Sequence, residues 1–344
     1  MATLQKEIIL RKDYLNNEEI GSIYFGGGTP SLLTIDEIET LLNLIQKNFR
    51  LKTDLEISFE ANPDDISKPY VNALKESGVN RLSLGIQSFN EQDLQMLGRV
   101  HSSHEALNSV EAITLAGFRS FSIDLIYGIP GSDNKTWLNN LMIFKQYNIP
   151  HLSSYSLTRE PKTILDFQIR RGIKTDTDEE QMREQFYTLT GFMQENKYVH
   201  YEISNFCKPD HISIHNSNYW KNKKYMGIGP SAHSYNLIQR QWNIGVNKDY
   251  MEGVDLGSGF FETELLSLED QFNEYLMLGL RTMWGVNLSK LYRISPQFNL
   301  DAFEDKLNFY IQNRFVKREQ DIILLTNEGI LFSDQIISEL FIVQ

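Results

Sequence analysis

Cysteine is nearly absent from this sequence, with Cys207 the only one among 344 residues. One cysteine cannot form a disulfide within the chain, and it cannot build a metal site that needs several thiolates. Long apolar runs are missing too, since no stretch approaches the roughly 20 residues of a membrane-spanning helix. The first fifteen residues carry Lys6, Glu7, Arg11 and Lys12 where a signal peptide needs an unbroken apolar run. We therefore expect a cytoplasmic protein.

Positive charge is also scarce. The chain has 33 lysines and arginines against 45 aspartates and glutamates, which gives a formal net charge of −12. This balance argues against broad attraction to phosphates, so we expect no nucleic-acid partner. The length and the hydrophobic content of 41% suffice for one large α/β domain with an appendage.

Strand-like runs alternate with helical segments over the first 235 residues. The predicted strands are residues 22–27, 55–63, 81–88, 121–130, 151–158 and 200–206. Ser102 and Glu105 have the spacing of a capping box, while Gly78 and Gly117 stand where helical runs should end. Repeated βα units predict parallel strands with right-handed crossovers, in an open sheet or a barrel.

The βα alternation lapses after about residue 235. A helix is predicted within 270–286 and another near 300–313, followed by two short strands around a turn and a closing helix. We interpret residues 236–344 as a small helical, winged-helix-like domain, and residues 1–235 as the βα domain.

Polar residues gather where the predicted strands end, which is where ligands bind in parallel α/β folds. They are Gly26 to Thr29, Glu60, Asn62, Gln87, Ser88, Asp124, Tyr127, Glu202 and Asn205. Any one of the carboxylates could simply cap the following helix. Five strand ends in succession favour a ligand site.

Three features of these strand ends have both a functional and a purely structural interpretation. Glycines 26 to 28 would let a ligand approach the main chain closely, although such a run is most often just a tight turn. Arg99 could bind a carboxylate in two parallel bonds, or it could be a solvated helix arginine. Asp124 interrupts an apolar run, where a carboxylate is costly unless groups such as ribose hydroxyls satisfy it.

The segment "HNSNYW", residues 215–220, combines an imidazole, two amides and two large aromatic rings. A flat macrocycle with a central metal would use these groups well, with His215 as axial ligand. The commoner alternative is a structural histidine packed among aromatic rings. Nearby, "GIGPSAHS" places His233 after two glycines, which indicates a packed turn.

In order along the chain, these segments resemble the radical S-adenosylmethionine (SAM) enzymes, and in particular the oxygen-independent coproporphyrinogen III oxidase-like family with its HemW-type heme-chaperone branch. The resemblance covers nearly the whole chain, through "YFGGGTPSLL", "EANP", "NRLSLGIQSF", "LGRVH", "SIDLIYGIPG", "HYEISNF", "HNSNYW", "GIGPSAHS" and "LLTNEGILFSDQIISEL". It implies a partial (β/α)6-type parallel barrel without its first strand, followed by the C-terminal domain.

The resemblance also implies two sets of ligand residues. Those implied for SAM are Gly27, Gly28, Thr29, Glu60, Gln87, Arg99 and Asp124. Among them, Gln87 and Asp124 would lie near the ribose and Arg99 would pair with the methionine carboxylate. Those implied for heme are His215, Asn216, Tyr219 and Trp220, with His215 on the iron.

One family motif is missing. Family members carry a C-x3-C-x2-C segment whose thiolates hold a [4Fe-4S] cluster, and this sequence has none of the three cysteines. We therefore expect the chain as given to be inactive in radical chemistry. Either the sequence is a shortened form of an ordinary member, or it is a cluster-free descendant. The presence of Glu60, Gln87, Arg99 and Asp124 favours the first explanation.

The leading functional expectation is a heme-binding chaperone that delivers heme to acceptor proteins. The alternative is an oxygen-independent coproporphyrinogen III oxidase, for which a porphyrinogen is the substrate. A cofactor-free interaction module and a barrel hydrolase using Glu60 and Asp124 are the remaining classes. Peripheral association with a membrane stays open, and the sequence gives no oligomeric state.

Overall fold

The computed structural model describes residues 1–294, 296 and 299–343, and the backbone packs into two compact units. The first unit comprises Met1–Gly21, Asp36–Leu55 and Ser213–Gln344, and the second comprises Ser22–Ile35 and Glu56–Ile212. Each unit is therefore assembled from stretches that are separated in the sequence. The division into domains 1–235 and 236–344 stays a prediction.

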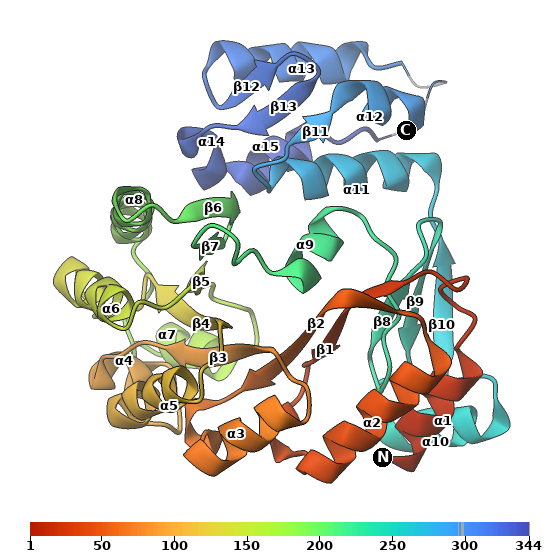
Figure 1. Ribbon diagram of the computed structural model, residues 1–344. Helices are drawn as coiled ribbons and strands as arrows, with labels where there is room; N and C mark the ends of the chain where they lie inside the picture. The colour runs from red at the N-terminus through yellow and green to blue at the C-terminus, as the bar shows by residue number, and fades with distance from the viewer. Residues whose placement is uncertain (295, 297–298, 344) are drawn as a thin grey trace. The chain divides into compact units, whose positions relative to one another are not determined.

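The second unit is built on most of a seven-stranded sheet with the order β1-β2-β3-β4-β5-β7-β6 (Figure 1). The strands are β1 (Ile20–Phe25), β2 (Leu51–Ala61), β3 (Arg81–Gln87), β4 (Ser120–Tyr127), β5 (His151–Ser156), β6 (Val199–Glu202) and β7 (Asn205–Cys207). β2, β3, β4 and β5 pair in parallel, each with the next. The predicted α/β class with a mainly parallel sheet is confirmed.

Strand register gives this sheet one polar face and one apolar face. Glu60 of β2 is aligned with Ser83 of β3, and Ser83 with Ser122 of β4. Asp124 lies two residues beyond Ser122 and is aligned with Ser153 of β5, so all five side chains project from the same face. The opposite face carries the other residues of the alternation, which are buried and apolar: Phe59, Leu82, Leu84, Phe121, Ile123 and Leu152.

Helices connect the strands of the second unit. They are the short 3₁₀ helices η1 (Pro30–Leu32) and η2 (Pro63–Asp65), and α3 (Lys68–Glu76), α4 (Glu91–Met96), α5 (Ser103–Leu115), α6 (Asn134–Gln146), α7 (Ile164–Arg170) and α8 (Glu179–Glu195). The predicted capping box of Ser102 and Glu105 begins α5. Gly78 and Gly117 follow α3 and α5 with φ of +103° and +73°, a conformation that ends a helix at little cost for glycine.

The sixth predicted strand is wrong in one respect. Residues 200–206 do not form a single strand, because the chain reverses between β6 and β7 and the two pair antiparallel. β7 in turn pairs antiparallel with β5. Glu202 and Asn205 consequently lie on either side of a tight reversal, where the Asn205 side chain donates a hydrogen bond to Glu202.

The first unit contains a three-stranded antiparallel sheet, in the order β10-β9-β8, that the sequence analysis did not predict. Its strands are β8 (His233–Tyr235), β9 (Gln239–Asn243) and β10 (Phe261–Leu265), and the helices nearby in sequence are α9 (Ile214–Trp220) and α10 (Asn247–Leu256). The unit also includes α1 (Ala2–Leu10) and nearly all of α2 (Ile35–Asn48). These strands are short and only partly buried. Their sequences therefore do not alternate between apolar and polar residues, which is the pattern that predicts a strand.

The remainder of the first unit has its own apolar core, centred on Phe272, Leu276, Leu307 and Ile336. Its elements are α11 (Leu268–Leu280), β11 (Val286–Asn287), α12 (Leu288–Ile294), α13 (Asp301–Gln312), β12 (Val316–Glu319), β13 (Ile322–Leu325), α14 (Asn327–Leu331) and α15 (Ser333–Leu340). The predicted helices, strand pair and closing helix are confirmed. No helix in the described part of the chain is both long and apolar enough to cross a membrane.

A buried ion pair on α1 anchors the loop that precedes β8. Glu7 is fully buried, and its carboxylate accepts hydrogen bonds from Arg11, 3.1 Å away, and from the main-chain N–H of Gly229 at 2.8 Å. Tyr250 and Asn243 also donate to this carboxylate, at 2.5 and 2.7 Å. Because each charge is met by several partners, the desolvation of the pair is offset.

Replacing Glu7 tests how much this network contributes to the free energy of unfolding. Glu7→Ala leaves Arg11 buried without its carboxylate, so we expect a loss of about 3–5 kcal/mol of unfolding free energy. Urea denaturation followed by fluorescence measures it. Lys6→Ala is the matched control, because Lys6 pairs with Asp255 on the surface at 3.0 Å and exposed pairs contribute about 1 kcal/mol or less. Equal midpoints for the two variants would contradict this account.

Candidate functional site

The end of β1 and the end of β2 meet through Glu60. The main-chain N–H of Gly27 donates to Glu60 Oε2 at 3.2 Å, and the hydroxyl of Tyr24 donates to Glu60 Oε1. Burial, followed by the charge of Glu60, raises the pKa of Tyr24, which keeps the phenol protonated as a donor. Two of the sequence-predicted residues, Gly27 and Glu60, are therefore in direct contact. Tyr24 donates a second hydrogen bond to the Glu60 carboxylate and so holds it in place.

Glycine occurs at positions 26, 27 and 28, after β1, for a different structural reason at each position. A Cβ on Gly26 would lie 2.3 Å from Cε1 of Tyr24 and 2.9 Å from Oε1 of Glu60, so Gly26 makes room for that hydrogen-bonded pair. Gly27 has a φ of +85°, which favours glycine. A Cβ on Gly27 or Gly28 would meet no atom within 4 Å. The open side of the loop is thus at Gly27 and Gly28, and Thr29 follows them as the residue before η1.

Asp124 lies on the polar face of the sheet, close to Glu60. Burial raises the pKa of Asp124 to about 7. A hydrogen bond with Ser153 and the charge of Arg99 oppose that rise, whereas the charge of Glu60 adds to it. The charges of Glu60 and Arg99 both act on Asp124, so the three side chains share one electrostatic neighbourhood.

Tyr155 belongs to this neighbourhood and was missed. It follows Ser153 on the same face of β5, and burial together with the charges of Asp124 and Glu202 raises the pKa of its phenol. The signal in the sequence was the polar run "SSYS" at a strand end, where apolar residues would be usual. Tyr24 and Tyr155 add neutral hydroxyl groups beside two carboxylates.

Gln87 ends β3 in an unusual conformation. Its φ is +68°, and the register between β3 and β4 shifts between Leu84 and Gln87. Such a conformation is costly for a residue with a side chain, and strained residues of this kind often cluster at ligand sites. The amide nitrogen of Gln87 lies 3.1 Å from where a Cβ of Gly85 would be, so the glycine leaves room for the amide.

The loop that carries Arg99 is fixed to the end of β3. His101 is buried, and its Nε2 lies 3.0 Å from the carbonyl oxygen of Ile86, next to Gln87. Gly98, with a φ of +67°, ends α4 and turns the chain into this loop. Arg99 itself is exposed. A ligand at the strand ends could therefore be reached by its guanidinium.

The second group of predicted residues lies on α9, in the first unit. Ser213 caps this helix by accepting from the N–H of Asn216 at 3.2 Å. His215 and Tyr219 are four residues apart and share one face of the helix, with ring centroids 5.0 Å apart and planes at 85°. Asn216 and Trp220 form the corresponding pair on the adjoining face.

Aromatic rings continue from Tyr219 beyond the helix. Tyr225 lies 4.7 Å from the Tyr219 ring, and Tyr235 of β8 lies 6.1 Å from Tyr225. Tyr225 and Tyr235 are also joined through their backbones by two hydrogen bonds, of 3.0 and 2.9 Å. The result is a row of rings that begins at an imidazole, with Tyr219 itself exposed. A flat aromatic ligand could stack against such a row.

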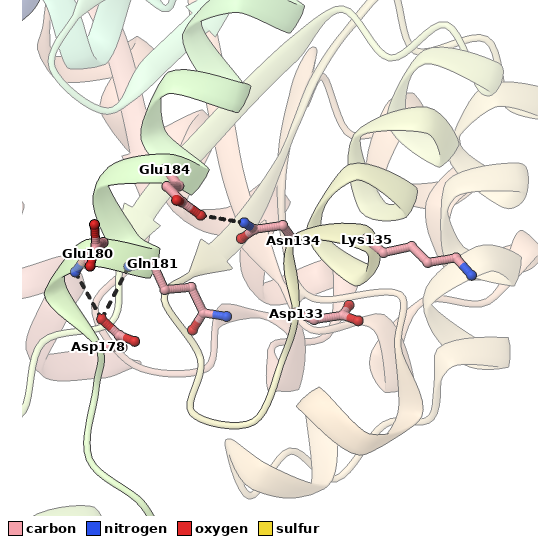
Figure 2. A pocket seen from close by; sticks show the side chains of 7 residues that line it. All are labelled: Asp133, Asn134, Lys135, Asp178, Glu180, Gln181 and Glu184. Atoms are coloured by element: carbon pink, nitrogen blue, oxygen red, sulfur yellow. Dashed lines mark hydrogen bonds between the residues drawn. The ribbon is translucent and has the colours of Figure 1, made fainter.

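A surface pocket of about 520 Å³ lies elsewhere in the second unit (Figure 2). It is lined by Asp133, Asn134, Lys135, Asp178, Glu180, Gln181 and Glu184. Asp133 and Asp178 cap the starts of α6 and α8, and Asn134 donates to Glu184 at 2.7 Å. Two of the lining residues thus serve helix ends, and the pocket contains none of the residues predicted from the sequence.

The residues of this chain do not fit a [4Fe-4S] cluster. Such clusters are held by several thiolates, and Cys207 is the only cysteine. It is buried on β7, where burial raises the pKa of its thiol to about 12. Within residues 1–294, 296 and 299–343, no three His, Cys, Asp or Glu side chains gather as metal ligands.

Family models match two parts of the chain. Residues 4–143 match the radical SAM superfamily, and residues 266–332 match the HemN C-terminal domain. The first match covers β1 to β4, with all of the predicted strand-end residues for SAM. Together with the parallel sheet, it defines the class as a radical SAM protein.

Curated relatives narrow the class. The chain is 34% identical to the heme chaperone HemW of Lactococcus lactis over 92% of this chain and 80% of that protein. It is 32% identical to the heme chaperone HemW of Bacillus subtilis, over 97% and 88% of the two chains. The chain belongs to the HemW family of radical SAM proteins.

A solved structure shares the fold. The coproporphyrinogen III oxidase HemN of Escherichia coli, a radical SAM enzyme, matches 99% of this chain and 82% of its own with a TM-score of 0.82. The sequence identity is 22%, so this likeness concerns architecture alone.

The contact of Gly26 with Tyr24 and Glu60 can be tested by adding one methyl group. We expect Gly26→Ala to lower the unfolding free energy by about 1–3 kcal/mol, because overpacking moves the Tyr24–Glu60 pair. Gly28→Ala is the control, since its methyl group meets open space, and it should change the urea midpoint little. Equal stability of the two variants would show that the packing at Gly26 is not tight.

Proposed function

We propose that this protein binds heme on α9 and passes it to acceptor proteins. The observation that carries the proposal is the position of His215 at the start of a continuous row of aromatic rings. Imidazole is a common axial ligand of heme iron, and the rings of Tyr219 and Tyr225 offer faces and edges to a macrocycle. The HemW relatives are heme chaperones, which supports the same ligand.

A chaperone must hold its cargo and also release it. A single imidazole beside an exposed tyrosine suits this requirement, because one side of the macrocycle would remain accessible to an acceptor. We propose that Asn216 and Trp220, on the adjoining face of α9, also contact the heme.

Hemin titration tests this proposal. Under anaerobic conditions the wild-type protein should give a saturable Soret band, and His215→Ala should weaken binding at least about tenfold while shifting the band. His104→Ala, which removes an exposed histidine of α5, is the control and should leave the titration unchanged. An identical band and affinity in His215→Ala would remove His215 as the iron ligand.

We further propose that the strand ends of the second unit bind SAM. The residues are Gly27, Gly28, Thr29, Glu60, Gln87, Arg99 and Asp124. The open space beside Gly27 and Gly28 suits the close approach of the methionine end of SAM. Arg99 is exposed, so its guanidinium is accessible to the methionine carboxylate. Asp124 supplies an acceptor for ribose hydroxyls and a negative charge for the sulfonium.

Protonation of Asp124 should weaken SAM binding. A carboxyl group with a pKa of about 7 is mostly ionised at pH 8 and mostly neutral at pH 6. We therefore expect the affinity for SAM, measured by calorimetry, to fall about tenfold from pH 8 to pH 6. Asp124→Asn should bind weakly at both values, whereas Asp64→Asn, at an exposed position, should behave like the wild type. A pH-independent affinity in the wild type would contradict this role.

A further inference from the structure

The chain segment that follows α9 is unusually basic for this protein. "WKNKKY", residues 220–225, places three lysines within four positions, although the chain as a whole has a net charge of −12. A protein with a large negative net charge repels a dianion unless nearby cations neutralise the charge of the dianion. Heme is a dianion at its periphery, because it carries two propionate carboxylates on one edge. A heme site on α9 therefore needs a local source of positive charge.

Two of the three lysines are available for a ligand. Lys224 forms an ion pair with Glu18 at 2.5 Å, and the nearby Arg240 pairs with Glu264 and Glu274. Lys221 and Lys223 are exposed, and neither forms an ion pair within the described residues. Their charges are thus not already neutralised, in contrast to those of the neighbouring cations.

The position of Lys221 is set by an aromatic ring. Its Nζ lies 4.1 Å from the ring centroid of Trp284, a cation–π distance. Lys221 also ends α9, six residues after His215, which corresponds to about 9 Å along a helix axis. This spacing along the axis suits a ligand whose central metal and charged rim lie a similar distance apart.

We propose that Lys221 and Lys223 bind the propionate carboxylates of heme, at the C-terminal end of the helix whose first turn carries His215. This inference rests on the proposed heme-binding function. It divides the site into a metal end at His215, an aromatic wall at Tyr219 and Tyr225, and a carboxylate end at the two lysines. Heme is then held in one orientation, with its charged edge beyond the end of α9.

The test compares hemin with hemin dimethyl ester, in which both propionates are esterified and uncharged. In the Lys221→Ala/Lys223→Ala double variant, hemin affinity should fall roughly tenfold or more, because charge-assisted contacts are lost. The affinity for the dimethyl ester should equal that of the wild type. The double arginine variant should restore hemin binding, since it keeps both charges.

Lys290→Ala is the matched control. Lys290 lies on α12 with its Nζ 4.5 Å from the ring centroid of Tyr275, so the variant removes a lysine–aromatic contact of the same kind. It should bind both hemin compounds as the wild type does. Melting temperatures of all variants, measured without ligand, check that each is folded.

The outcomes separate the two proposals. A wild-type protein that gives no saturable Soret band with hemin overturns the heme function, and this inference with it. Saturable hemin binding that is unchanged in the double alanine variant overturns the role of the lysines alone. An equal loss of affinity for hemin and its dimethyl ester also overturns it, because a lysine that only supports the fold would weaken both.

Discussion

The parallel register of β2, β3 and β4 is the constraint on which the second unit depends. Because Glu60, Ser83 and Ser122 are aligned, the polar residues of three strands share one face, and Asp124 lies one side-chain repeat further along it. The hydroxyl of Ser122 donates to that of Ser83 at 3.0 Å, which satisfies part of this face internally. A slip of one residue would turn the carboxylates toward the apolar helices and remove the site.

At the strand ends, this alignment creates a group of charges that the fold alone does not require. Burial destabilises the ionised carboxylate of Asp124, and Ser153 and Arg99 offset this only in part. Gln87 has a left-handed backbone conformation, which is unfavourable for a residue with a side chain. Glu60, in contrast, is held by Tyr24 and by the main chain of Gly27. Strained and desolvated groups beside a rigidly held one are typical of a preorganised ligand site.

The first unit positions its residues by different means. Glu7 of α1 and Arg11, the residue that follows this helix, fix β8 and the loop before it. Arg11 donates to the carbonyl oxygen of Gly227 and to the hydroxyl of Ser234 in β8, both at 2.9 Å. β8 carries Tyr235, whose backbone pairs with Tyr225 in the aromatic row. The surroundings of α9 therefore depend on a helix more than 200 residues earlier in the chain.

The sequence by itself determined the α/β class and most strands, because apolar runs and helix caps are local signals. It did not determine the reversal between β6 and β7 or the sheet β10-β9-β8, whose short strands carry no periodic pattern. Only the tertiary structure decided that Gly26 makes room for Tyr24 and Glu60, and that Lys221 lies over Trp284. The contacts of Gly26 with Glu60 and of Lys221 with Trp284 join residues far apart in the chain, and no local preference encodes which partners will meet.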